Sequence, residues 1–146
     1  MISINRSEGT IAMRKILKQT KQKIQQGKSI IIFPEGTRNP GGLGLGLSGV
    51  ALLALRSQAP ILPIAISGTG HMQGLWRLAC PSGKIRVTIG DPFSLPVVEG
   101  KVRRPQLESL ADMIMLRVAN LLPDGLRGAY RTGSPNRTLD VESKGS

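Results

Sequence analysis

A turn at residues 34–38 carries the residue types best suited to chemistry on a ligand. Glu35 can accept hydrogen bonds from hydroxyl groups or hold a guanidinium, and Arg38 can bind a phosphate through two donors. Pro34 fixes the backbone, while Gly36 permits a close approach of the chain or a positive φ. This combination favours a phosphate-bearing polyol as ligand. The alternative is a surface turn with an exposed Glu–Arg pair, and the residue types alone leave both open.

The turn follows a continuous apolar run at residues 29–33, which predicts a strand buried on both faces. Open α/β sheets bind ligands at the carboxyl ends of their strands, so the turn has the expected position. Apolar residues at helical spacing predict a helix before this strand, up to about Gln26, with Gly27 as its stop signal. The other predicted elements are strands at 2–6, 61–67 and 84–89, and helices at 50–56 and 106–122.

These elements alternate as β-α-β-α-β, which predicts an α/β fold: a single domain with a mixed, mostly parallel sheet flanked by helices. The first predicted strand begins almost at Met1, so we expect the domain, residues 1–130, to be incomplete at its N-terminus. Residues 131–146 contain almost no apolar side chains to offset the entropy of ordering. They are predicted to form a disordered tail.

Composition narrows the classes of partner. The chain has 146 residues, and 20 Lys and Arg against 9 Asp and Glu give a net charge of +11, which favours anionic partners. Aromatic residues are too few for the stacking surfaces typical of single-strand and RNA binding, so no nucleic acid is expected. Cys80 is the sole cysteine, which excludes an intrachain disulfide. With no signal peptide or long apolar run visible, we expect a cytoplasmic protein.

The segment Ile31-Ile32-Phe33-Pro34-Glu35-Gly36-Thr37-Arg38-Asn39 resembles the third signature block of the lysophosphatidic acid acyltransferase family. Residues 4–6 and 61–66 resemble the second and fourth blocks, in the same order and spacing, and residues 121–130 are similar to bacterial members. The resemblance implies transfer of an acyl group from acyl-CoA or acyl-carrier protein to 1-acyl-glycerol-3-phosphate, giving phosphatidic acid. It implies no bound cofactor and no metal.

The resemblance also implies which residues bind substrate. Arg6 and Arg38 match family arginines associated with the substrate phosphate. Pro63 would shape the apolar side of the site, although a proline at a strand edge explains it equally well. The implied substrate-binding set is Arg6, Glu35, Gly36, Thr37 and Arg38.

Two features depart from the family pattern. The first block, a histidine followed five residues later by an aspartate, supplies the general base of the family, and this sequence does not contain it. Its sole histidine, His71, is followed at that distance by Trp76, so we expect a loop histidine, with a substitute base as the alternative. Leu47 to Gly49 stand where many relatives carry a lysine. The catalytic residues are therefore unknown, and we interpret the chain as a truncated form.

Three functional hypotheses follow. The leading one is an acyltransferase of phospholipid synthesis, whose basic helix at residues 14–28 either rests on the anionic inner face of the cell membrane or is simply solvated. The second is a non-catalytic remnant of that fold that binds lipid or phosphate. The third is nucleic-acid binding through net charge, which the scarcity of aromatic residues disfavours.

Overall fold

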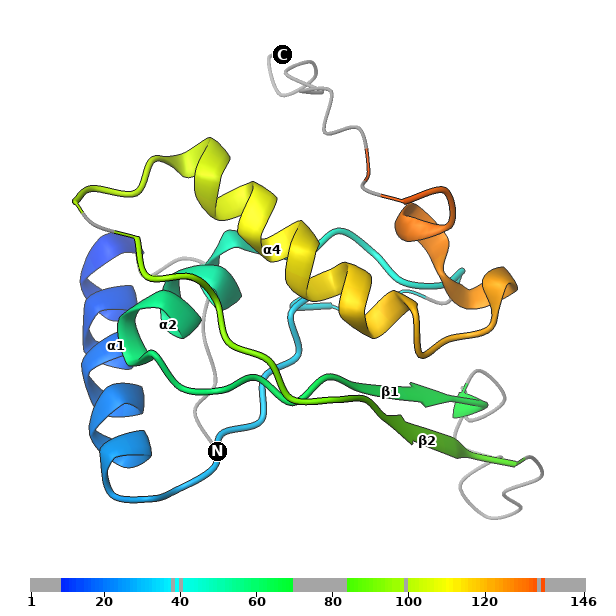
Figure 1. The fold of residues 1–146 in the computed structure, drawn as a ribbon, viewed down its shortest axis with the longest axis horizontal. Coiled ribbons are helices and arrows are strands. Elements are labelled where there is room, and N and C mark those ends of the chain that lie inside the picture. Colours follow the sequence, from blue (N-terminus) through cyan, green and yellow to red (C-terminus); the bar gives the residue numbers. More distant parts are fainter. Residues whose placement is uncertain are drawn as a thin grey trace.

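The computed structural model describes residues 9–37, 39, 41–69, 84–98, 100–133 and 135. Helix α1 lies at one edge beside α2, α4 crosses over α2, and the strands β1 and β2 extend away from beneath α4 (Figure 1). The elements in chain order are α1 (Gly9–Gln25), α2 (Ser48–Ser57), β1 (Ile64–Ser67), β2 (Arg86–Ile89), α4 (Arg104–Ala119) and the 3-10 turns η2 (Asp124–Leu126) and η3 (Gly128–Tyr130).

The α/β class is confirmed, but the sheet differs from the prediction. Its two strands, β1 and β2, pair antiparallel, with Ile64 opposite Ile89 and Ser67 opposite Arg86. The predicted strand at residues 29–33 forms no ladder with any described residue, and Ile31 is 84% exposed instead of buried. An apolar run becomes a strand only where a neighbouring strand satisfies its backbone groups. The described chain therefore has an antiparallel sheet, not a mostly parallel one; the strand predicted at 2–6 lies outside the described residues.

The two faces of the β1–β2 pair differ. Ala65 is 3% exposed on the face that meets α4. Residues opposite each other in the register share a face, so the other face carries Ile64, Ile66, Val87 and Ile89. These four side chains are between 44% and 62% exposed. Half of this short sheet is thus apolar and uncovered by the rest of the described chain.

Helix α4 supplies half of the buried hydrophobic residues of the described chain. It begins after Arg103, whose backbone N–H donates to Oε1 of Gln106 at 2.8 Å, and Pro105 is tolerated because it lies in the first turn. The predicted helix at 106–122 is confirmed with a slightly earlier start and end. Its core-facing side chains meet α2 and the segment before α4 in one cluster, formed by Ala51, Leu95, Leu110, Ala111 and Ile114.

The described helices include none that is both long and apolar enough to cross a membrane. The boundary predicted at residue 130 is not tested, because most of the segment after it lies outside the described residues.

Candidate functional site

The turn after residue 33 is held in one conformation by a glycine. Gly36 has a φ of +64° and donates its N–H to the carbonyl of Phe33 at 3.2 Å. A Cβ added at this position would lie 2.6 Å from Cδ1 of Leu47. The positive φ is what favours glycine here, since the leucine side chain could shift to make room for a Cβ. Glu35, Gly36 and Thr37, three of the predicted substrate-binding residues, thus lie together in this turn.

The carboxylate of Glu35 holds the loop that follows the turn. Its Oε2 accepts hydrogen bonds from the backbone N–H of Gly44 at 2.7 Å and from Nδ2 of Asn39 at 2.6 Å. The N–H of Leu47 donates to the carbonyl of Pro34 at 2.9 Å. The two bonds to the carboxylate of Glu35 are charge-assisted, and such bonds are among the stronger hydrogen bonds in proteins. The segment 41–47, called here the glycine loop, is therefore wrapped around Glu35.

A second set of bonds fixes the glycine loop from the C-terminal side. Leu43 donates its N–H to the carbonyl of Leu126 at 3.0 Å and accepts from the N–H of Ala129 at 2.9 Å. Gly128 has a φ of +48°, and a Cβ there would collide with the backbone of Leu43. Residues 126–129 thus bond to the loop as a neighbouring strand would.

A buried tyrosine completes this attachment. The hydroxyl of Tyr130 donates to Oδ1 of Asp112 at 2.7 Å and accepts from the N–H of Gly46 at 3.1 Å. Tyr130 is 2% exposed and Asp112 5% exposed, so the three groups satisfy one another away from solvent. Composition gives no sign of this network; the position of Asp112 on the buried side of a predicted helix is the signal that could have revealed it.

The other predicted site residues are placed as follows. Arg6 and Arg38, the two implied phosphate ligands, lie outside the described residues, and so does His71. Pro63 is buried immediately before β1, where its carbonyl accepts from the N–H of Gly90 at 3.0 Å. Its side chain lies 3.1 Å from the point where a Cβ on Gly90 would sit. Pro63 is therefore an interior residue that lies beside the chain segment of Gly90.

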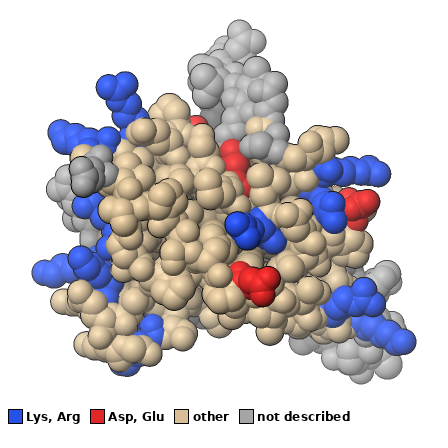
Figure 2. Space-filling model, viewed as in Figure 1, with Lys and Arg blue, Asp and Glu red and all other residues tan. Residues whose placement is uncertain are grey.

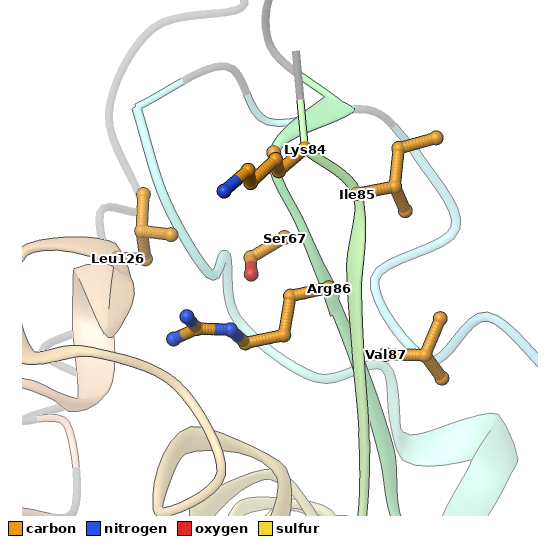
Figure 3. Close-up of a pocket in the computed structure, with 7 residues that line it drawn as sticks. Ser67, Lys84, Ile85, Arg86, Val87 and Leu126 are labelled. Atoms are coloured by element: carbon orange, nitrogen blue, oxygen red, sulfur yellow. The ribbon is translucent and has the colours of Figure 1, made fainter.

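A pocket of about 470 Å³ lies at the end of the β1–β2 pair. Ser67, Lys84 and Arg86 extend from the strands toward Leu126 on its far side, whereas Ile85 and Val87 point the other way (Figure 3). The sequence pattern predicts a strand at residues 84–89 but no site there. The signal was the alternation of basic and apolar residues from Lys84 to Val87, which places both cations on one face.

Neither cation of the pocket is neutralised within the described chain. The ion pairs found in the described chain join Arg104 to Glu108 and Arg127 to Asp124, each at 2.9 Å. Neither of them includes Lys84 or Arg86. Figure 2 shows Lys and Arg side chains around the rim of this face of the molecule, with few acidic ones among them. The site thus combines an internally bonded turn around Glu35 with an open, positively charged pocket.

Part of the chain matches a known protein family. Residues 1–67, which include the turn and all of β1, match the Acyltransferase family model. That region therefore belongs to the acyltransferase class.

Relatives with curated names narrow this class. A 1-acyl-sn-glycerol-3-phosphate acyltransferase of Pseudomonas aeruginosa is 36% identical over 90 residues, 61% of this chain and 35% of the relative. A chloroplastic protein of that name from Brassica napus is 38% identical over 79 residues, 53% of this chain and 23% of the relative. A probable one from Mycoplasma pneumoniae is 41% identical over 64 residues, 42% of this chain and 24% of the relative.

The chain is thus similar, over part of its length, to proteins named 1-acyl-sn-glycerol-3-phosphate acyltransferase, in line with the resemblance of its third signature block. The aligned parts span 23% to 35% of the length of these three relatives. No solved structure matches the chain.

Proposed function

We propose that the chain serves the synthesis of phosphatidic acid, in which an acyl group passes from acyl-CoA or acyl-carrier protein to 1-acyl-glycerol-3-phosphate. The observation that carries this proposal is the match of residues 1–67 to the acyltransferase family, with the third signature block held as a fixed turn inside it. A turn anchored by its own loop presents its remaining groups to a ligand with little loss of entropy on binding.

In this proposal the substrate phosphate is bound by Arg6 and Arg38, and Glu35, Gly36 and Thr37 line the same pocket. Glu35 does so with one oxygen already engaged: both of its hydrogen bonds fall on Oε2. Its part is therefore to shape the turn, which leaves phosphate recognition to the arginines. Pro63 supports the acyl side from the interior.

Transfer requires a base that removes the proton from the attacking glycerol hydroxyl. The sequence holds a single histidine, His71, without an aspartate five residues later. We assign no catalytic base within this chain. This departure from the family motif supports one alternative: non-catalytic binding of a lipid or phosphate by the same turn.

Peripheral contact with an anionic membrane at the cytoplasmic face belongs to the same proposal. Lys18, Lys21 and Lys23 are exposed on α1, and Lys28 is exposed just beyond its end. Each basic residue near an anionic surface contributes roughly 1 kcal/mol to binding. A solvated basic helix is the alternative, and sedimentation with vesicles with and without anionic lipid separates the two.

The reaction itself is tested by incubating the chain with acyl-CoA and lysophosphatidate and following phosphatidic acid by mass spectrometry. Product formed above the uncatalysed rate supports transfer by this chain. Selective lysophosphatidate binding without product favours the non-catalytic alternative. Absence of both binding and product overturns the proposal.

A further inference from the structure

The β1–β2 pair brings three hydrogen-bond donors to one face. Ser67 lies directly opposite Arg86 in the register, and Lys84, two residues before Arg86, shares its face by the period of a strand. Figure 3 shows the hydroxyl, the ammonium and the guanidinium directed into the same pocket. Gly68 has a φ of +86°, and a Cβ added there would collide with the carbonyl of Lys84, so a glycine fits best at this end of the strand pair.

The two cations of this set are not bonded through their side chains within the described chain. The side chains of Lys84 and Arg86 are exposed and take part in none of its ion pairs or side-chain hydrogen bonds. The carboxylate of Asp124, on the 3-10 turn that supplies the pocket's Leu126, is already paired with Arg127. Two like charges on neighbouring positions of one face repel each other, and an anion between them removes that repulsion.

One residue connects the pocket to the turn at residues 34–37, called here the signature turn. Leu126 forms a wall of the pocket, and its carbonyl accepts the N–H of Leu43 at 3.0 Å. The next residue, Gly44, donates to Glu35 at 2.7 Å. A ligand in the pocket would therefore lie against the segment that also holds the glycine loop around Glu35.

We propose that Ser67, Lys84 and Arg86 form a second anion site, which binds a phosphate group of the acyl donor's carrier arm. Arg86 offers paired donors, Lys84 a point charge and Ser67 a hydroxyl, a set suited to phosphate oxygens. Both thioester donors of the proposed reaction carry a phosphopantetheine arm, so one phosphate is common to them. The assignment of this phosphate to the acyl donor rests on the proposed function. The suitability of the three side chains for binding a phosphate group does not depend on it.

The test is calorimetric titration of the full chain with 4′-phosphopantetheine and with pantetheine, which lacks the phosphate. The variant Lys84→Ala/Arg86→Ala should bind phosphopantetheine about 100-fold more weakly, since each charge-assisted bond contributes roughly tenfold in affinity. The matched control Lys101→Ala/Arg131→Ala removes two exposed cations outside the pocket and should stay within about twofold. Arg86→Lys, which keeps the charge but loses the paired donors, should fall between them.

Equal losses in the pocket variant and the control, or equal affinity for the two probes, would overturn the site. A third arm uses vesicles of phosphatidylcholine with and without phosphatidylglycerol. If the pocket variant weakens vesicle binding and leaves phosphopantetheine binding unchanged, the phosphate belongs to a lipid headgroup and the donor assignment is wrong. Lysophosphatidate affinity should not change in the pocket variant, so failure here is distinguishable from failure of the proposed function.

Discussion

The glycine loop and the pocket at the end of the β1–β2 pair use the same kinds of polar group in opposite ways. Around the loop, Glu35, Asp112 and Tyr130 bond to groups of the protein itself. In the pocket, Lys84 and Arg86 face an open volume with no partner in the described chain. Internal bonding fixes a backbone, whereas unpaired donors on a rigid strand pair are available to a ligand. The internal bonds of the first region therefore support the turn around Glu35, whereas the cations of the second region are open to a ligand.

The largest loss of stability is expected at Gly128, whose backbone lies close to the backbone of Leu43. Gly128→Ala should lower the free energy of unfolding by about 3 kcal/mol, because the new Cβ forces Leu43 away and opposes the positive φ. Urea denaturation measures the change. Gly125→Ala is the control, since a Cβ there meets nothing within 4 Å, and it should change stability by less than about 0.5 kcal/mol. Equal effects would contradict the attachment of the loop.

Tyr130→Phe removes only the hydroxyl between Asp112 and the N–H of Gly46. We expect a loss of about 2 kcal/mol, because two buried polar groups each lose a hydrogen bond. Asp124→Asn, which changes an exposed acid in a surface ion pair, should cost less than about 1 kcal/mol in the same denaturation series. If Tyr130→Phe leaves the free energy of unfolding unchanged, the ring of Tyr130 contributes by packing alone and its hydroxyl does not stabilise the fold.

Glu35→Gln should have a smaller effect, about 1 kcal/mol, since an amide oxygen can still accept the two bonds but without charge. Amide hydrogen exchange at Gly44 reports on the loop directly and should accelerate. Glu108→Gln, a control in a helix-surface ion pair, should leave exchange at Gly44 unchanged. If the two variants behave alike, the carboxylate of Glu35 does not hold the loop.

The smallest effect on stability is expected in the pocket. Lys84→Ala/Arg86→Ala should change the free energy of unfolding by less than about 0.5 kcal/mol, because neither side chain has an internal partner to lose. Thermal unfolding checks this result. A loss above about 1.5 kcal/mol would show that the two cations stabilise the fold and would remove the contrast between the regions.

Much of the helical part of the fold could be predicted from the sequence. The apolar spacing of Leu107, Leu110, Ala111 and Ile114 located α4 and its core face. The sheet could not be predicted in the same way, because strand pairing depends on residues far apart in the chain. The apolar run at 29–33 has strand composition, yet no described segment offers it a ladder.

The site was predictable only in part. The signature block predicted the turn and the similarity to acyltransferases, because its residue types follow one another along the chain. The partners of Glu35, at Asn39 and Gly44, depend on how the glycine loop folds back, and no spacing rule gives that. Tyr130 reaches Gly46 across 84 positions of sequence, so only the tertiary structure brings them together.

The central claim is that the signature turn belongs to a site for a glycerol phosphate. Its most direct test is titration of the chain with a short-chain lysophosphatidate and with the matching lysophosphatidylcholine, each repeated with Arg38→Ala. We expect the chain to prefer lysophosphatidate, and to lose at least about tenfold in affinity in Arg38→Ala but not in Arg131→Ala. Equal affinity for the two lipids, or equal losses in the two variants, would contradict it.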